Sequence, residues 1–448
     1  MKSLVVVTLL ALTACVLKAQ SPTDIPALKG LAPVTVLENT PAGQAALGSN
    51  YAVTGGIQTG DIRQATMLPF AAQQQQALQD VFITFGDIAQ LADGLGTTLG
   101  GAYVARAHYL DRTKFTNVSP AMASVIAYAQ VTSAANSNAG KFFFANETTD
   151  GKTPVSTEAK AILKDNGGKP DMFGRNYGRP AGTEGADKYG NSRPFQTEPR
   201  IVQIVGPDYL NVPANNDVYN RGPIMNLTDS PSYPSGHTTY GYTGALLLAV
   251  LVPQRYQEMV TRGAEYGNDR IIMGAHYAMD VLGGRTLATY DLAHLLANDP
   301  VYVDRSLTGV AKVKDFRALV KEARADLTSA LQTACGKTME ECAREDTGRF
   351  NNAAANESFY LSTQTYGLPV VYPQNAGKTE DVSKLAPEAG YLLTVAYPTL
   401  TLEQADRILT ETEGPGGGFL DDGSSFGVYS RLNLYAAAGR AAAMTGQP

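Results

Sequence analysis

The chain has 448 residues, of which 44% are hydrophobic and 17% are charged, and its formal net charge is −6. A chain of this length can bury one large core with an extension, or form two domains. The slightly acidic balance excludes the broad basic surface of most nucleic-acid-binding domains, so we expect no nucleic-acid partner, and any anion site must be local.

Residues 1–19 have the features of a secretory signal peptide, with an apolar run from Leu4 to Ala14 that is followed by small residues. We therefore predict a periplasmic or secreted protein. Two ways of processing this segment remain open: cleavage after Ala19, or lipidation of Cys15 as in a lipoprotein. Simple export is favoured, because Val16-Leu17-Lys18 is an unusual sequence to follow a lipidated cysteine. No later apolar run has the length of a membrane span.

The next part of the chain changes from loop-like to helical composition. Residues 20–70 are rich in Pro, Gly and Thr, which predicts a loose N-terminal arm with one short strand at 34–39. Residues 71–300 predict a helical core, which begins with amphipathic helices over 76–96 and 119–135.

A polar stretch from about 146 to 226 is too rich in Gly, Pro, Asn and Asp for one helix, and long loops of this kind usually serve a site. Helical patterns resume over 238–252, 254–266 and 269–298. The last of these contains Gly283-Gly284, which predicts either a kink or close packing.

Residues 301–448 are predicted to form a C-terminal helical extension. Three roles remain open for it: it covers the core, forms a dimer contact or narrows the pocket. Cys335 and Cys342 are seven positions apart, and in an oxidising compartment they are expected to form a local disulfide rather than a metal site. The glycine run 414–418 lacks the Lys-Ser/Thr of a phosphate loop and is interpreted as a linker. With few strand signals in the chain, the fold class is predicted to be mainly α.

Pro234-Ser235-Gly236-His237 stands at the start of an apolar helical run. A helix N-terminus has unpaired N–H groups and partial positive charge, so it attracts anions. Gly236 would let an anion approach the backbone, Ser235 would add a hydroxyl donor, and His237 would lie beside the bound group. Taken alone, the stretch also fits a simple serine cap with an incidental histidine.

His276 and Asp280 are four residues apart, so on a helix they would share one face. A carboxylate at one imidazole nitrogen fixes the tautomer and leaves the other nitrogen free as a nucleophile. Arg270 lies nearly two helical turns earlier and can offer a planar fork of donors to the same anion. A surface His–Asp pair is the alternative interpretation of this stretch.

Arg193 precedes Pro194 and therefore belongs to an extended or turn segment, from which it can reach a site. The other two histidines of the chain receive structural interpretations. His108 is expected on a helix surface, and His294 near a helix C-terminus, where positive charge is tolerated.

Together, the three motifs resemble the type 2 phosphatidic acid phosphatase (PAP2) superfamily and, within it, the secreted bacterial class A non-specific acid phosphatases. The ordered pattern is Arg-Pro, then Pro-Ser-Gly-His, then Arg, five residues, His, three residues and Asp, and it covers roughly residues 189–298. The resemblance implies a helical-bundle core related to the vanadium haloperoxidases. It also implies a phosphorylated small-molecule substrate and no metal or other cofactor.

The resemblance also assigns roles to individual residues. It implies that His276 attacks phosphorus and becomes a phosphohistidine, that Asp280 orients it, and that His237 protonates the leaving group and then activates water. The residues that would hold the phosphoryl oxygens are Arg193, Ser235, Gly236 and Arg270.

Two positions depart from the family pattern. The family places a lysine seven residues before the Arg of Arg-Pro, but Ala186 stands there, and Lys188 is only five residues before Arg193. Three explanations remain open: Lys188 reaches into the anion site, another cation takes the place of the family lysine, or the site has one positive charge fewer. Asp269 replaces the Ser before Arg270, and we expect its carboxylate to face away from an anion site. A rival pair, Arg179-Pro180, fits the pattern no better.

Three functions are compatible with these motifs. The first is a metal-independent phosphomonoesterase with an acidic optimum, because His237 must carry a proton to act as an acid. The alternative is a vanadium-dependent haloperoxidase that binds vanadate in the same cradle. The third is a non-catalytic phosphate-binding protein, and for any of the three a homo-oligomer is left open.

Overall fold

The structure, a computed structural model, describes residues 25–61, 66–81, 84–110, 113–198, 227–345 and 348–446. All regular elements in these ranges are helices, and an isolated antiparallel bridge joins Thr148 and Pro154. The mainly α fold class is therefore confirmed. The predicted signal peptide and Cys15 lie outside the described residues. No helix within these ranges is long and apolar enough to cross a membrane.

The helices of the N-terminal part are α1 (Ile25–Leu31), η1 (Ala32–Asn39), α2 (Pro41–Thr59), α3 (Phe70–Gln79), η2 (Ala89–Leu95), α4 (Thr97–Arg106), α5 (Pro120–Asn146), α6 (Thr157–Asp165), α7 (Met172–Asn176) and α8 (Pro194–Thr197). The helices of the central part are η5 (Leu227–Asp229), α9 (Gly236–Leu251), η6 (Pro253–Arg255), α10 (Tyr256–Ile272) and α11 (Ala278–Leu296). The helices of the C-terminal part are α12 (Phe316–Cys335), α13 (Met339–Glu345), α14 (Ala353–Thr365), α15 (Pro373–Ala376), α16 (Val382–Leu385), η7 (Pro387–Gly390), α17 (Tyr391–Thr394), α18 (Leu402–Glu411), α19 (Ser425–Tyr429) and α20 (Leu434–Thr445).

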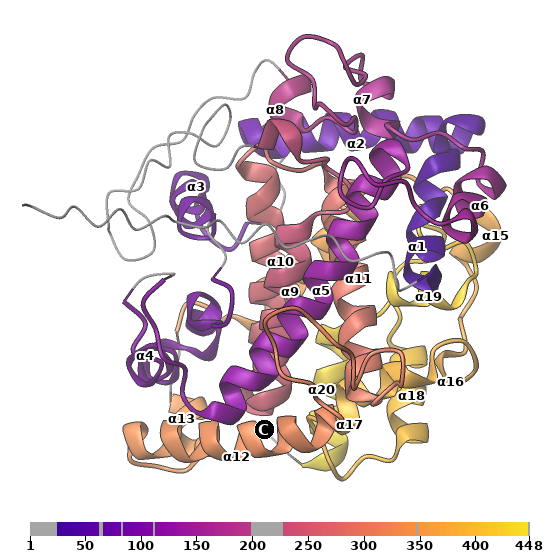
Figure 1. Cartoon of the computed structure of the whole chain (residues 1–448). Coiled ribbons are helices and arrows are strands. Elements are labelled where there is room, and N and C mark those ends of the chain that lie inside the picture. The colour runs from indigo at the N-terminus through magenta and orange to yellow at the C-terminus, as the bar shows by residue number, and fades with distance from the viewer. Residues whose placement is uncertain are drawn as a thin grey trace, which may run out of the picture.

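Helix α9 is at the centre of the bundle. Its sequence, GHTTYGYTGALLLAVL, is apolar or small around nearly the whole circumference, and every residue except His237 is buried. A helix of this kind must be enclosed by other helices. α5, α10 and α11 enclose it, and Figure 1 shows the four elements together in the middle of the molecule. The first turn of α9, which contains His237, is therefore the part of this helix that can meet a ligand.

Gly283 and Gly284 lie inside α11 and allow it to pack closely, one of the two outcomes predicted for them. A Cβ on Gly283 would lie 2.7 Å from the ring of Tyr233, and a Cβ on Gly284 would lie 2.6 Å from the carbonyl oxygen of Ser235. Both contacts are shorter than a carbon side chain tolerates. The glycine pair thus brings α11 directly against the segment that starts α9.

The predicted N-terminal arm at 20–70 is wrong as a description of residues 25–61, because these residues form α1, η1 and α2. The predicted strand at 34–39 is also wrong, since these residues lie in η1. Val34 and Leu37 are buried in the main hydrophobic core, so tertiary burial decides the conformation here against the β propensity of the local sequence.

Two predicted helices are interrupted by glycines with left-handed backbone angles. The predicted helix over 76–96 is wrong, because α3 ends at Gln79 and Gly86 has a φ of 90°. The predicted helix over 269–298 divides into α10 and α11 at Gly274, whose φ is 70°. Other residues adopt this conformation only at an energetic cost, so the backbone turns where glycine permits it.

The C-terminal extension packs against the core on several sides. α12 contacts α5 and α4, α14 and α20 contact α10, and α17 and α19 contact α11. Figure 1 shows α12 across the lower end of the bundle and α17, α18 and α20 beside it. Of the roles predicted for this extension, covering the core is the one that these contacts display.

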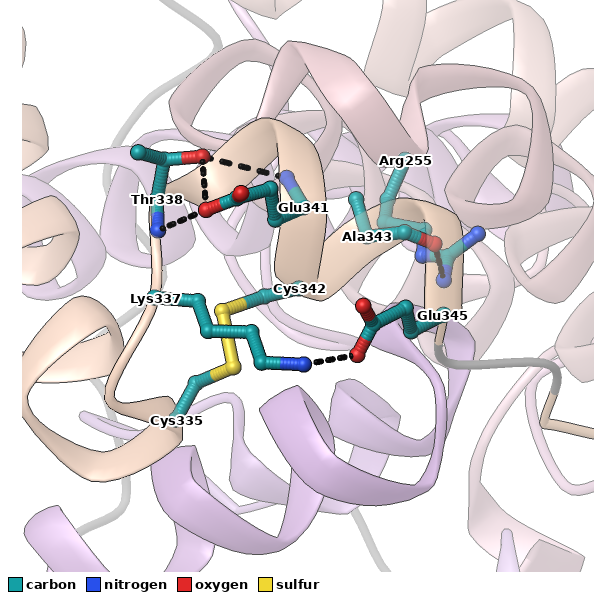
Figure 2. The surroundings of a disulfide bond; sticks show 8 residues. All are labelled: Arg255, Cys335, Lys337, Thr338, Glu341, Cys342, Ala343 and Glu345. Atoms are coloured by element: carbon teal, nitrogen blue, oxygen red, sulfur yellow. Dashed lines mark hydrogen bonds and ion pairs between the residues drawn. A yellow bond between two sulfur atoms is a disulfide. The ribbon is translucent and has the colours of Figure 1, made fainter.

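Cys335, at the end of α12, and Cys342, in α13, form the predicted disulfide (Figure 2). The carbonyl of Ala343 accepts a hydrogen bond from Arg255, which fastens α13 to the core, and Thr338 and Glu341 bond to each other at the start of that helix. The disulfide therefore closes a short loop between two elements that are already packed.

Replacing both cysteines, Cys335→Ser with Cys342→Ser, should lower the free energy of unfolding by about 2–3 kcal/mol, because the unfolded chain regains the entropy of a short open loop. Urea unfolding of the double variant, beside the wild type with and without reductant, measures the loss. Equal stability of all three samples would contradict the expectation.

Asp406, in α18, is buried, and burial raises the pKa of its carboxyl to about 7, an effect that Glu388 and Asp381 reinforce. Because the folded-state pKa lies above the unfolded value, this group costs stability as pH rises from about 4 through about 7. Asp406→Asn should therefore be more stable than wild type by roughly 2–4 kcal/mol at pH 8, with little difference at pH 4.

Urea unfolding of wild type and Asp406→Asn at both pH values measures this difference. Glu403→Gln is the matched control on the same helix, since its side chain is 82% exposed. A pH-independent difference for Asp406→Asn, or the same gain in Glu403→Gln, would contradict the assignment.

Candidate functional site

Arg193 ends an extended segment just before α8, with φ −90° and ψ 162°, as expected for a residue that precedes proline. Its side chain is fully buried. Nε donates to the Ser230 carbonyl at 2.7 Å, and Nη1 donates to the Ala275 carbonyl at 2.9 Å. Nη1 also lies 3.0 Å from Nε2 of His276. The carbonyls thus hold a planar cation rigidly beside this imidazole.

His276 and Asp280 are in contact, but not as two residues of one helix. His276 lies in the connection that follows α10, whereas Asp280 is in the first turn of α11. Oδ2 of Asp280 accepts from Nδ1 of His276 at 3.1 Å, from the backbone N–H of Tyr277 at 2.9 Å and from the hydroxyl of Ser232. This arrangement places the imidazole proton on Nδ1 and leaves the lone pair on Nε2.

The electrostatic surroundings keep this imidazole neutral. Burial, followed by Arg193, Lys141 and Arg270, holds the pKa of His276 well below its usual value. Burial raises the pKa of Asp280 to about 7, against the opposing effects of its hydrogen-bond donors and of the nearby cations. With the proton on Nδ1, the Nε2 lone pair accepts a hydrogen bond from Arg193, and a neutral imidazole in this state can act as a nucleophile once an electrophile displaces that contact.

Two side chains of α2 hold the start of α11 in place. Oγ1 of Thr54 accepts from the Ala278 N–H at 3.0 Å, and Oδ1 of Asn50 accepts from the Met279 N–H at 2.9 Å. These N–H groups have no partner within their own helix. The N-terminal region, which was predicted to be a loose arm, thus positions the turn that contains Asp280.

Pro234-Ser235-Gly236-His237 forms the N-terminus of α9, as predicted. Ser235 is the N-cap, and its Oγ accepts from the Thr238 N–H at 3.1 Å, which leaves its hydroxyl proton available for another acceptor. The Ser235 N–H donates to the Asp280 carbonyl at 3.0 Å, so the two motifs are joined through the backbone.

His237 is the one partly exposed residue of α9, and its buried Nδ1 has no hydrogen-bond partner among the described residues. Burial, then Arg270, Lys141 and Arg193, holds the pKa of His237 well below its usual value. The same three cations act on His276, and His237 itself contributes to the lowered pKa of His276. The two imidazoles therefore share one electropositive environment.

Arg270 lies in the last turn of α10 and is fully buried. None of its three guanidinium nitrogens has a hydrogen-bond partner within the described part of the chain. Its carbonyl accepts from the N–H groups of Ala275 and His276 at 3.1 and 3.2 Å, which ties it to the nucleophile segment. A buried guanidinium with unused donors is costly unless an anion binds it.

Asp269 faces away from this cluster, as expected. Its Oδ1 accepts from Nε2 of Gln73 at 2.9 Å. Burial, Asp80 and Glu265 all raise its pKa. Its carboxyl group thus belongs to a separate polar network, with α3.

Lys188 and Arg179 do not take part in the cluster. Lys188 is 61% exposed and pairs with Asp229 at 3.7 Å. Arg179 is exposed, and its Nη1 donates to the Glu184 carbonyl at 3.4 Å. The interpretation in which Lys188 reaches into the site is therefore wrong, and the reason is its position on the outside of the loop.

A lysine that the sequence analysis missed lies in the cluster instead. Lys141, near the end of α5, is 6% exposed, and a Cβ on Gly236 would lie 3.2 Å from its Nζ. A signal for it exists in the sequence, because Lys141 is the one charged residue in the 27 residues of α5. A lone charge in a long buried helix usually has a specific partner.

The remaining two histidines lie outside the cluster. His108 is exposed, but it lies in the turn after α4 with a φ of 45°, so the predicted position on a helix surface is wrong. His294 lies in the last turn of α11, where Nδ1 is 2.7 Å from Oδ2 of Asp299. Across the described ranges, no group of three or more His, Cys, Asp or Glu residues is arranged to hold a metal ion.

The site is thus an anion cradle with three cations and two imidazoles. The PAP2 superfamily profile matches residues 186–298, which contain every residue of the three motifs. A non-specific acid phosphatase of Salmonella typhimurium is 46% identical over 69 residues, which are 15% of this chain and 28% of that protein. An acid phosphatase of Zymomonas mobilis is 45% identical over 64 residues, 14% of this chain and 24% of that protein. A non-specific acid phosphatase of Providencia stuartii is 39% identical over 72 residues, 16% of this chain and 29% of that protein.

One segment of the chain, residues 186–298, is therefore similar to the PAP2 superfamily. The aligned part spans less than a third of the length of each of these relatives.

Proposed function

We propose that this protein is an acid phosphatase that hydrolyses phosphate monoesters through a phosphohistidine on His276. The observation that carries the proposal is the position of His276, with Nδ1 on Asp280 and Nε2 beside the Arg193 guanidinium. That arrangement supplies a nucleophile and a cation at the same point, which is what transfer of a phosphoryl group requires.

In the first step, the unpaired guanidinium of Arg270 binds the phosphoryl oxygens, with the Ser235 hydroxyl and the Gly236 N–H as further donors. The five N–H groups of Arg193 already donate to neighbouring carbonyls, to the Ser230 hydroxyl and to His276, so Arg193 contributes mainly its positive charge. Nε2 of His276 forms a bond to phosphorus while the bond to the ester oxygen breaks. The positive charge that develops on the imidazole favours the ionised form of Asp280, and the carboxylate in turn stabilises that charge.

In the same step, His237 donates a proton to the departing alkoxide. His237 then takes a proton from a water molecule, which attacks phosphorus, and the bond to Nε2 breaks to release inorganic phosphate. The protonated form of His237 is needed first, and its lowered pKa in the free site favours activity at acid pH. Bound phosphate would raise that pKa by offsetting the cations.

The cations of the cradle take the place that metal ions occupy in many phosphoryl-transfer sites, so we propose a reaction without a metal ion or other cofactor. The relatives compared above are named acid phosphatases, and nothing in the site favours the vanadium haloperoxidase alternative. Export to the periplasm or medium through the segment 1–19, with cleavage after Ala19 or lipidation at Cys15, is part of the proposal, as is a small phosphorylated substrate.

A screen of phosphate esters tests the proposal. Purified full-length protein should release phosphate from p-nitrophenyl phosphate and from β-glycerophosphate, faster at pH 5 than at pH 8, and equally with and without chelator. Tight phosphate binding without turnover of any ester would support the non-catalytic alternative instead.

A further inference from the structure

We propose that Lys141 of α5 is a substrate-binding cation of this site and fills the place that the family pattern gives to position 186. This inference rests on the proposed function and deepens it. It identifies a residue that lies far outside the three motifs in sequence and that no spacing rule would find.

The approach of α5 to the helix mouth is the first observation. α5 packs along α9, and Gly140 allows the approach, since a Cβ there would lie 3.1 Å from Cδ of Pro234. The next residue, Lys141, then places its Nζ against Gly236. A Cβ added to Gly236 would lie 3.2 Å from this Nζ. Any larger residue at position 236 would meet the ammonium group, so the glycine and the lysine fit together.

The state of the ammonium group is the second observation. Lys141 is 6% exposed, and its Nζ takes part in no hydrogen bond or ion pair within the described ranges. Nζ itself is not fully enclosed and keeps some contact with solvent. A buried ammonium needs a partner to offset its lost hydration. The phenolic oxygen of Tyr240 would also lie 3.2 Å from a Cβ on Gly236, but a neutral hydroxyl cannot neutralise a cation. A phosphoryl oxygen at the α9 N-terminus would do so.

The electrostatic coupling is the third observation. The charges that act on Lys141 are those of the cluster: Arg193, Asp280, Arg270 and Asp187. Lys141 in turn contributes to the lowered pKa values of His237 and His276. Lys188 appears in none of these interactions, so the loop lysine nearest to the family position is not equivalent to Lys141.

A consequence for pH dependence follows. Burial and the neighbouring Arg193 and Arg270 lower the pKa of Lys141 to about 7, while Asp280 and Asp187 oppose them. The free site therefore loses this positive charge as pH rises through about 7, and substrate binding weakens there. An arginine at 141 would stay charged across that range.

The experiment compares full-length Lys141→Met, Lys141→Arg and the matched control Lys188→Met. It measures kcat/KM for p-nitrophenyl phosphate from pH 4 to 9 and competitive inhibition by inorganic phosphate. At pH 5, Lys141→Met should lower kcat/KM about 10²-fold and raise the phosphate inhibition constant at least about tenfold. Lys188→Met should stay within about twofold of wild type. Lys141→Arg should keep its affinity for inorganic phosphate above pH 7, where that of the wild type declines, although turnover of both proteins falls as His237 loses its proton.

Three results would overturn the inference: wild-type kinetics in Lys141→Met, equal losses in Lys188→Met, or a wild-type pH dependence of phosphate inhibition in Lys141→Arg. If Lys141→Met does not fold, the pH dependence of phosphate inhibition in Lys141→Arg decides alone. If the wild type releases no phosphate from any ester, the proposed function fails. Calorimetric titration of wild type and Lys141→Met with inorganic phosphate then still decides whether Lys141 binds the anion.

Discussion

His276→Ala should lower kcat for phosphate release from p-nitrophenyl phosphate by about 10⁴-fold or more, because the change removes the atom that bonds to phosphorus. The remaining cations would still bind the ester, so KM should change far less than kcat. Rapid-quench experiments with ³²P-labelled substrate should leave label on the wild-type protein after an alkaline quench, where a phosphorus–nitrogen bond survives, and none on the variant.

His108→Ala is the matched control, since it removes an exposed imidazole outside the cluster. It should have wild-type kcat and should retain the label. Because His276 is fully buried, circular dichroism and thermal unfolding must first establish that His276→Ala is folded. A folded variant with even a tenth of the wild-type rate would remove His276 from the role of nucleophile.

His237→Ala should slow formation and hydrolysis of the phosphohistidine to different degrees, depending on whether the leaving group needs a proton. With β-glycerophosphate, whose alkoxide needs a proton, the first step should slow by about 10²–10⁴-fold. With p-nitrophenyl phosphate the leaving group departs without a proton, so the first step should remain fast. Hydrolysis of the phosphohistidine would still lack its base, and p-nitrophenol should appear as a burst close to one equivalent per enzyme.

Stopped-flow absorbance at 400 nm measures the burst, and steady-state phosphate release measures the slow phase that follows. The wild type, in which both steps use His237, provides the reference. Equal losses for the two esters, with no burst, would show that His237 acts in binding rather than in proton transfer.

The sequence was sufficient for those parts of the site whose chemistry is local. Arg193 is extended because a proline follows it, and Ser235 caps α9 because a serine before an apolar helix accepts the free N–H groups. The contact of His276 with Asp280 also follows from their spacing, although a turn at Gly274 brings it about instead of a continuous helix.

The remainder depended on contacts between distant segments. Lys141 reaches the cluster only because α5 packs beside α9, and Asn50 and Thr54 reach α11 only because the N-terminal region folds back on the core. Local composition predicted a loose arm there, since propensity does not report what a segment will be buried against. Tertiary packing determined both results.

The enclosure of α9 limits how far the protein can be reduced in size. A fragment cut to 186–298, the region that matches the PAP2 superfamily profile, would retain every motif residue but lose α5, α2 and the helices that cover α10. It would expose the apolar flank of its central helix to water and would lack both a cation and the supports of the Asp280 turn. The segment that carries the family motifs is therefore shorter than the part of the chain that is needed to enclose α9 and to complete the site.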